Sequence, residues 1–232
     1  MGLLCYFTVT PNIIFMYGMN CFSCLLVYLV EWKVQFCLRT HVFSFSLQLY
    51  CRFLRELNLQ ENEVEDHGPQ WLSCFPDSCT SLVSLNFACL KGEVNAGALE
   101  RVVARSPNLR SLKLNRVVST ETLFKILLRA PQLVDLGTGS FTLDLQSEAY
   151  HRLLNVFIKC KSLRSLSGFW DASPRCLSAV YPICWKLTTL NLSYAPAIRG
   201  ADLIKFIRQC HKLQRLWVIK TFLISKYSQL CI

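Results

Sequence analysis

The chain has 232 residues, of which 52% are hydrophobic and 17% are charged, and its formal net charge at pH 7 is +10. This composition is too apolar for a chain that is disordered throughout, and the length allows one large domain or two small ones. The positive charge would suit a nucleic acid, an anionic membrane or a polyanionic small molecule, but it also fits the solvated faces of helices.

Thirteen cysteines are spread along the chain. Because a chain of this length can bury a core without disulfides, and because most of these cysteines have apolar or helical surroundings, we expect buried thiols in a reducing compartment. Cys21 and Cys24 have the spacing of a redox or zinc motif, but no second CxxC or HxxxH follows at a matching distance. We therefore predict no metal site.

Residues 1–50 are rich in Phe, Cys, Tyr, Leu and Val and show neither helical nor strand periodicity. The first residues lack the basic region and the small-residue cleavage site of a signal peptide. The apolar stretch 19–30 is shorter than the roughly 20 residues that a membrane helix needs, and Glu31 and Lys33 close it. We expect no membrane association, and a membrane anchor in residues 1–50 is kept as an alternative that carbonate-resistant membrane binding would support.

From Cys51 to Val218 one phrase, leucine-x-x-leucine-x-apolar, occurs seven times. The seven copies begin at Leu54, Leu82, Leu109, Leu133, Leu163, Leu187 and Leu213. Their starts are 28, 27, 24, 30, 24 and 26 residues apart, which is typical of leucine-rich repeats of about 20 to 29 residues. The spacing predicts an α/β leucine-rich-repeat solenoid, a partial horseshoe with parallel strands on its concave face and helices on its convex face.

Each copy of the phrase predicts a short strand whose central leucine points into the solenoid. These leucines, which we expect to form one buried ladder, are Leu57, Leu85, Leu112, Leu136, Leu166, Leu190 and Leu216. Between the strands, AGALERVVARSPN, TETLFKILLRAPQ, SEAYHRLLNVFIKC and GADLIKFIRQCHK predict amphipathic helices. Thr120 and its neighbours supply an N-cap signal, and Pro107 and Pro131 predict where two helices end.

The residues on either side of each central leucine should line the concave surface. In the middle repeats they are mostly small and uncharged, which makes a poor surface for gripping nucleic-acid phosphates. Arg215 and Trp217 differ, because a guanidinium and an indole together can hold an anion or a flat ring. With Lys113 on an earlier strand, they are the candidate binding residues; the alternative is that Arg215 and Trp217 are rim residues whose neighbouring repeat is missing.

No group of residues has the pattern of a catalytic site. Gly137–Ser140 reads GTGS, but no Lys-Ser or Lys-Thr pair follows it, so we interpret it as a structural turn rather than a phosphate loop. The four histidines are scattered over different segments and none is paired with a cysteine or a carboxylate in a recognisable ligand pattern. We therefore predict a binding protein and no enzyme.

Several segments resemble the plant auxin receptors, the transport-inhibitor-response and auxin-signalling F-box family. They include LVSLNFACLKGEVNAGALERVVARSPNLRSLKLNRVV, RAPQLVDLGTGSF, CKSLRSLSGFWDASPRCLSAVYPIC, KLTTLNLSYA and CHKLQRLWV. The resemblance implies a substrate-receptor subunit of a nuclear SCF ubiquitin ligase. In that family an F-box docks a Skp-type adaptor, the solenoid holds inositol hexakisphosphate, and auxin joins an Aux/IAA-type repressor degron to the receptor for ubiquitination.

The chain departs from the family pattern at both ends. Residues 1–50 show no F-box helices, the family's auxin-contacting positions cannot be carried onto this sequence, and Arg215 is the one basic residue that we expect as an inositol-phosphate contact. We therefore expect incomplete binding of inositol hexakisphosphate. Residues 1–50 and 219–232 have the composition that thymine-rich codons give, so we hypothesise a gene model that reads through two introns around repeats in residues 51–218.

The alternative function is a stand-alone leucine-rich-repeat scaffold, or a decoy that binds full-length receptors or repressors. A repeat array with two uncapped ends would expose its leucine ladder and its strand edges. We accordingly expect poor soluble expression of residues 51–218 unless caps are added.

Overall fold

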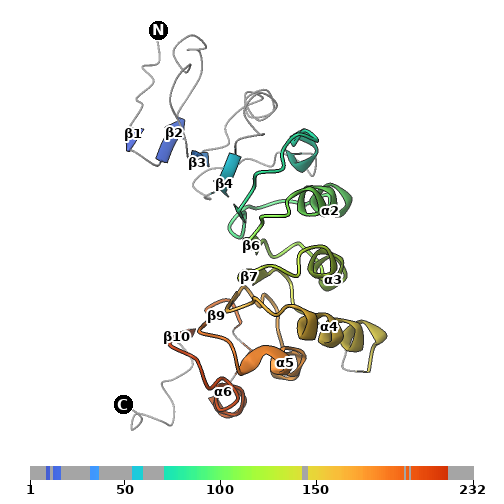
Figure 1. Ribbon diagram of the computed structural model, residues 1–232. Helices are drawn as coiled ribbons and strands as arrows, with labels where there is room; N and C mark the ends of the chain where they lie inside the picture. The colour runs from blue at the N-terminus through green and yellow to red at the C-terminus, as the bar shows by residue number, and fades with distance from the viewer. Residues whose placement is uncertain are drawn as a thin grey trace, which may run out of the picture. The chain divides into compact units, whose positions relative to one another are not determined.

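A computed structural model describes residues 9–10, 13–16, 32–36, 54–59, 71–142, 146–195, 197–198 and 200–218. The chain divides into two compact units, Met1–Leu112 and Lys113–Ile232, called here the first and the second unit (Figure 1). The motif at Cys21 and Cys24 and the tail 219–232 lie outside the described residues. The predicted division into 1–50, 51–218 and 219–232 stays a prediction.

The first unit contains the first described repeats. Its repeat elements are β4 (Leu54–Leu59), the 3-10 helix η2 (Trp71–Cys74), β5 (Ser84–Asn86), α2 (Ala96–Arg105) and the start of β6 (Ser111–Leu114). Strands β4 and β5 pair in parallel with Leu57 opposite Leu85, as the repeat phrase predicts. Short strands also occur in the segment without periodicity, β1 (Val9–Thr10), β2 (Ile13–Met16) and β3 (Trp32–Phe36). The sequence did not predict them because their segment carries no leucine phrase.

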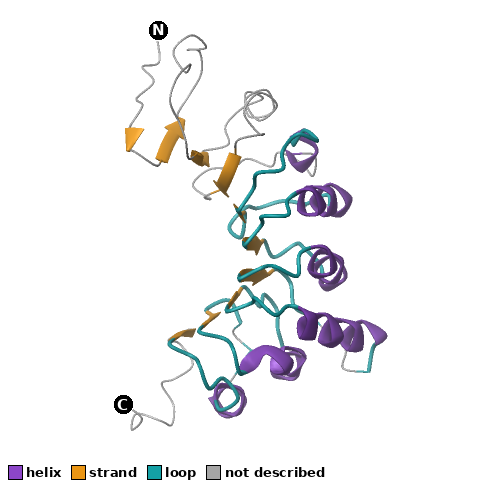
Figure 2. Cartoon of the chain, viewed as in Figure 1, coloured by secondary structure: helices purple, strands orange, loops and turns teal. Residues whose placement is uncertain are grey.

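The second unit is a run of alternating strands and helices. Its strands after β6 are β7 (Asp135–Thr138), β8 (Ser165–Ser167), β9 (Thr189–Leu192) and β10 (Arg215–Val218), and its helices are α3 (Thr120–Arg129), α4 (Glu148–Lys159), η3 (Pro174–Val180), α5 (Tyr181–Cys184) and α6 (Gly200–Ile207). Strands β7 to β10 pair in parallel in chain order. Within this unit the helices lie on one side of the strands (Figure 2). This arrangement confirms the α/β leucine-rich-repeat fold.

The predicted leucine ladder is confirmed for all positions but the last. Leu136 lies opposite Leu166, which lies opposite Leu190, and all three side chains are fully buried. Leu216 lies opposite Leu190 but is 39% exposed, so the prediction that it is buried was wrong. The physical reason is that β10 is the last described strand, and no described repeat covers its far side.

Local signals explain where the helices begin and end. Asn95, Ser119 and Ser147 are N-caps, and their side-chain oxygens accept hydrogen bonds from the backbone N–H groups three residues later. The N-cap near Thr120 is thus Ser119. Helices α2 and α3 end immediately before Ser106-Pro107 and Ala130-Pro131, so these predicted ends are confirmed. The segment η3–α5 was not predicted, because its prolines interrupt any long helical period.

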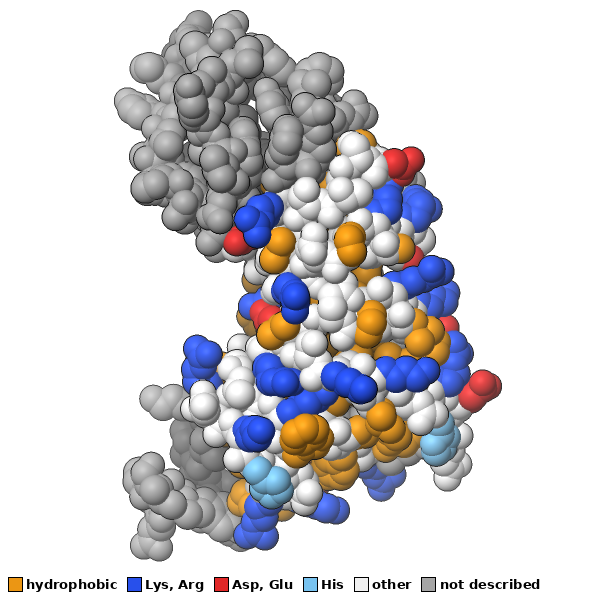
Figure 3. All heavy atoms as spheres, viewed as in Figure 1, with side chains coloured by type: hydrophobic (Ala, Val, Ile, Leu, Met, Phe, Trp, Pro, Cys, Tyr) orange, Lys and Arg blue, Asp and Glu red, His pale blue; other side chains and the backbone are white. Residues whose placement is uncertain are grey.

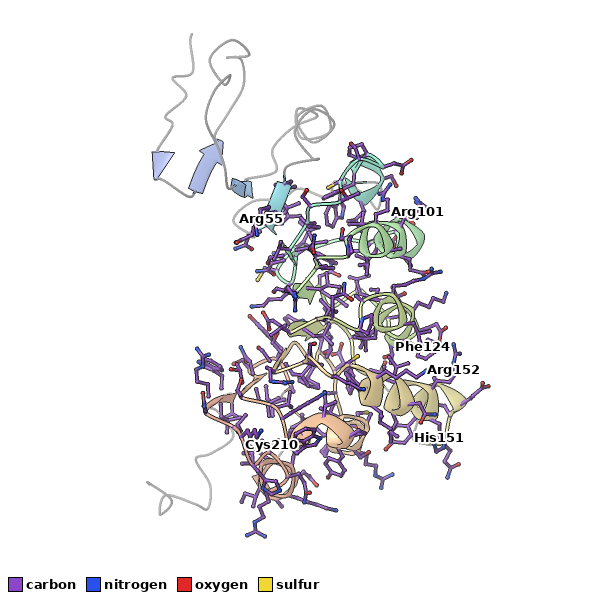
Figure 4. The ribbon with its side chains drawn as sticks, in the orientation of Figure 1. Arg55, Arg101, Phe124, His151, Arg152 and Cys210 are labelled. Carbon is purple, nitrogen blue, oxygen red and sulfur yellow. The ribbon has the colours of Figure 1, made fainter. Side chains whose placement is uncertain are left out.

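Neighbouring helices of the second unit pack against each other along the outer layer, α4 on both α3 and η3. Arg152 of α4 points toward Phe124 of α3, with its guanidinium carbon 4.0 Å from the ring centroid (Figure 4). The same guanidinium lies 3.7 Å from the carboxylate of Glu121. A cation over a ring and an ion pair therefore join the exposed sides of α3 and α4.

Three buried cysteines occupy the same place at the ends of successive helices. Cys160, Cys184 and Cys210 each donate from Sγ to the carbonyl four residues earlier, at 3.4, 3.5 and 3.6 Å. Burial raises the pKa of the Cys160 thiol to about 11. A hydrogen bond to Cys210 first, and burial second, raise the pKa of the Cys184 thiol. Buried thiols, which the sequence predicted, are confirmed at these positions; Cys89 is exposed.

None of the helices in the described part of the chain combines the length and the apolarity needed to cross a bilayer.

Candidate functional site

The strand face of the second unit is formed by the residues on either side of the central leucines. From β7 to β9 it carries Asp135, Ser165, Ser167, Thr189 and Asn191, all partly exposed. Gly137 is buried on this face, where an added Cβ would lie 3.0 Å from the Cα of Lys113. Gly137 thus leaves no room for a side chain, and the face around it is polar and nearly uncharged.

Lys113 is a member of this face whose charge is already balanced. Its Nζ lies 3.2 Å from Oδ2 of Asp135 on the neighbouring strand. Because both side chains are partly exposed, the pair is a modest attraction rather than a source of much stability. A ligand anion would have to compete with Asp135, so Lys113 is a weak binding candidate.

Arg215 and Trp217 lie on β10, opposite Thr189 and Asn191 of β9. Both are exposed, Trp217 at 45%, and Arg215 forms no ion pair with any residue that the structure describes. Four strand spacings of about 4.8 Å separate β6 from β10, so Lys113 lies roughly 19 Å from them. The structure therefore keeps Arg215 and Trp217 together but does not bring Lys113 to them.

A strained loop follows β8 and was not predicted as a site. In this loop, Gly168–Asp171, called here the FWD loop, the backbone φ angles of Phe169 and Asp171 are 57° and 61°, and that of Gly168 is 87°. Residues other than glycine rarely adopt positive φ, and such conformations persist only where surrounding contacts hold them. The FWD loop must accordingly be fixed by its neighbours.

Three hydrogen bonds anchor the FWD loop to the turn after β7. The N–H of Phe169 donates to the hydroxyl of Thr138 at 2.7 Å. The N–H of Phe141 donates to the carbonyl of Trp170 at 2.8 Å, and the N–H of Trp170 donates to the carbonyl of Gly139 at 3.1 Å. Thr138 is completely buried and Gly139 has a φ of 68°. Gly137 and Thr138 end β7, and the chain turns at Gly139 and Ser140, so the GTGS segment has a structural role, as predicted.

A two-pronged ion pair closes the exposed side of the loop. Arg116, which follows β6, donates from Nε and Nη2 to the two carboxylate oxygens of Asp171, at 2.9 and 2.6 Å. Asp171 also raises the pKa of the Arg116 guanidinium, through this hydrogen bond first and its charge second. Side-by-side bonds of this kind fix the direction of a carboxylate as well as its position.

The aromatic residues of the loop divide between core and surface. Phe169 is fully buried and meets Phe141 edge to face at 5.2 Å. Trp170 stacks on Tyr194, with ring centroids 4.1 Å apart and an interplanar angle of 20°, and Tyr194 is 40% exposed. The buried Trp170 Nε1 has no hydrogen-bond partner among the described residues. The loop thus presents a rigid aromatic surface with a polar border.

Arg116, Trp170, Asp171 and Tyr194 form a cluster at the carboxyl ends of the strands, called here the edge cluster. Sequence reasoning missed it because Arg116 and Asp171 are 55 residues apart and neither belongs to a strand. The one available signal was the string GFWDASP, which the sequence offered only as a family resemblance. The edge cluster can hold a ligand by stacking and charge, and it contains no nucleophile paired with a base.

Among the residues that the structure describes, no group of three or more His, Cys, Asp or Glu is placed to hold a metal ion.

Comparisons with known proteins give close relatives for most of the chain. Two transport inhibitor response 1-like proteins of Oryza sativa subsp. japonica are 57% identical to it over 169 residues. GRR1-like protein 1 of Arabidopsis thaliana is 55% identical over 169 residues, again covering 73% of this chain. The repeats belong to the auxin-receptor F-box family. The family resemblance predicted from the repeat wording is therefore confirmed.

The family match concerns a part of each relative. The aligned segment covers 73% of this chain but 29% to 30% of the rice proteins and 29% of the Arabidopsis protein. No protein-family model matches the chain. Among solved structures, the crystal structure of a TLR13–ssRNA13 complex overlaps 72% of this chain and 23% of its own, with 16% identity and a TM-score of 0.39, which is too low to bear on function.

Proposed function

We propose that these repeats are part of the substrate-receptor subunit of an SCF ubiquitin ligase, in which auxin-dependent binding of Aux/IAA-type repressors leads to their ubiquitination. The observation that carries this proposal is the 57% identity over 169 residues to the transport inhibitor response 1-like proteins. Docking of a Skp-type adaptor and a location in the nucleus are proposed on the same family ground.

The geometry supports a binding role without a chemical step. The edge cluster is held in advance by the FWD loop and by the Arg116–Asp171 pair, so little order would be lost when a partner docks. Its exposed groups can stack and pair with charge but cannot transfer protons or form a covalent intermediate by any recognisable arrangement. We propose accordingly that the protein is no enzyme and acts by selecting what the ligase modifies.

The described residues do not fit a complete site for inositol hexakisphosphate. Such a ligand needs several cations that converge on one place. On the strand face of the second unit, Lys113 is paired with Asp135, and Arg215 stands beside Trp217 at the far strand. We therefore propose Arg215 as one contributor to such a site, with the other cations supplied from outside these described strands.

A chimeric receptor tests the proposed function. Residues 51–218 of this chain would replace the aligned repeats in one of the rice relatives, and the binding of a fluorescent repressor degron peptide would be measured with and without auxin. We expect the chimera to bind the degron only when auxin is present. A chimera that folds and docks the adaptor but binds no degron would contradict the proposal.

The same binding assay on the 232-residue chain alone distinguishes the alternative function from the receptor function. Capture of the degron by the 232-residue chain, equally with and without auxin, would favour the stand-alone scaffold or decoy. The matched control is the same chain with Arg116→Ala and Asp171→Ala, which removes the charged half of the edge cluster while leaving the leucine ladder intact.

A further inference from the structure

Three turns lie side by side at the amino ends of β8, β9 and β10, at the strand ends opposite the edge cluster. The N–H groups of Leu163, Leu187 and Leu213 close these turns onto the carbonyls three residues earlier, at 3.3, 3.1 and 3.0 Å. The turns are also bonded to each other, because the N–H of Thr188 donates to the carbonyl of Arg164 at 2.8 Å and that of Gln214 donates to the carbonyl of Thr188 at 2.9 Å. We call this surface, residues 160–164, 184–188 and 210–214, the turn edge.

The turn edge is positively charged and has no counter-charge close by in sequence. Lys161, Arg164 and Lys212 are exposed on it. The sequence contains no Asp or Glu between Asp171 and Asp202 and none after Asp202. Within the described part of the chain, none of these three cations forms an ion pair. Figure 3 shows Lys and Arg side chains gathered over the second unit on the face in view. A patch of this kind attracts negative partners from solution.

The buried residue Lys186 adds a further positive charge to the turn edge. Lys186 is 5% exposed, and its Nζ donates to the carbonyl of Cys160, which links the second turn to the first. Burial first and the charge of Arg164 second lower the pKa of the Lys186 ammonium. Positive charge is therefore crowded at this edge instead of being balanced.

An indole stands in the middle of the turn edge. Trp185 is 56% exposed, and the Nζ of Lys212 lies 5.6 Å from its ring centroid. Tryptophan is enriched among the few residues that carry most of the binding energy at protein interfaces. Arg164, Trp185 and Lys212 thus lie on three neighbouring turns that are about 4.8 Å apart, at a different position within each turn.

We propose that the turn edge binds a short acidic segment of a partner protein, with carboxylates over Arg164 and Lys212 and an apolar side chain against Trp185. The two outer turns are roughly 10 Å apart, which is the length of about three residues of extended chain. Alternate side chains of an extended chain share one face, so a segment of the form acidic-x-apolar-x-acidic, about 13 Å from its first to its last residue, presents two carboxylates and an apolar side chain to the turn edge together. Nucleic acids are less favoured because a row this short reaches few phosphates, and a bilayer is less favoured because one indole offers little apolar area for insertion.

A peptide-binding experiment tests this proposal independently of the auxin receptor function. The full 232-residue chain, fused to a soluble carrier, would be titrated into a fluorescein-labelled Glu-Glu-Leu-Asp-Glu peptide at low salt, with the carrier alone and a Lys-Lys-Leu-Lys-Lys peptide as controls. Variants would be Trp185→Ala, the double change Arg164→Glu with Lys212→Glu, and Arg175→Glu, which places a single charge reversal on exposed η3. Circular dichroism would establish that each variant is folded.

We expect the acidic peptide to bind and the basic peptide not to bind. Trp185→Ala and the double charge reversal should each weaken binding about tenfold, Arg175→Glu should change it less than about twofold, and added salt should weaken it. No saturable binding below about 1 mM, or an equal loss with Arg175→Glu, would overturn the proposal. Binding of a single-stranded DNA 20-mer or of phosphatidylserine vesicles in place of the peptide would also overturn it.

Discussion

The hydroxyl of Thr138 links β7 to the FWD loop through hydrogen bonds, and replacing this residue with valine tests how much those bonds contribute to stability. Its hydroxyl accepts the N–H of Phe169 at 2.7 Å and lies 3.3 Å from the carbonyl of Ser167, in a completely buried position. Thr138→Val keeps the shape of the side chain but removes the partner of the buried N–H of Phe169 and of the partly buried carbonyl of Ser167. At about 1 kcal/mol or more for each group, the free energy of unfolding should fall by about 2 to 3 kcal/mol.

The change would be measured as the midpoint of urea unfolding, followed by far-ultraviolet circular dichroism, or as a fall in Tm of about 4 to 12 °C. Thr188→Val is the matched control, because its hydroxyl donates to the carbonyl of Arg164 at 3.2 Å in an exposed setting. The control should cost less than about 0.5 kcal/mol. Equal losses for the two variants would refute the reasoning that the buried hydroxyl holds the FWD loop.

Three further predictions concern stability. Gly139→Ala should lower the free energy of unfolding by about 2 kcal/mol or more, because φ is 68° and the new Cβ would lie 2.8 and 2.9 Å from two carbonyl oxygens. The control is Gly200→Ala, whose Cβ would have nothing within 4 Å and which should be nearly neutral in the same urea assay. Leu190→Ala should cost about 2 to 5 kcal/mol and Leu216→Ala less than half as much, since their exposed fractions are 0% and 39%; equal costs in thermal unfolding would show that Leu216 is covered. Because burial raises the folded-state pKa of Cys160 from 9.0 to about 11, the unfolded chain loses this proton first, so stability should fall as the pH rises from 9 to 11; Cys160→Ala should make that fall shallower, and an unchanged pH profile would contradict this.

The repeat architecture was predictable because its signals are local and periodic. The leucine phrase places strands within a residue or two, and the N-caps Asn95 and Ser119, with the prolines that follow, bound α2 and α3. Leu216 shows the limit of that reasoning. The phrase predicts that its side chain points inward, but whether an inward side chain is buried depends on a neighbouring repeat, which the phrase itself does not contain.

The edge cluster and the turn edge were not predictable from the same signals. Arg116 and Asp171 meet across two repeats, and the positive φ of Asp171 has no sequence signature comparable to a glycine. Lys113 stays a predicted binding residue, but the structure adds that its charge is paired with Asp135 on the neighbouring strand. Charge compensation between strands is a tertiary property, so a reading of single repeats cannot find it.

The buried cysteines at the helix ends can report the local unfolding of the repeat to which each belongs. Cys160, Cys184 and Cys210 are buried in successive repeats, so none can react with an alkylating reagent until its own repeat opens. In a linear array of repeats, opening can begin at one place and spread to neighbours. Mass spectrometry after proteolysis would give the order in which these three thiols are alkylated in the native protein. That order would map the path of partial unfolding without a probe residue introduced by mutation.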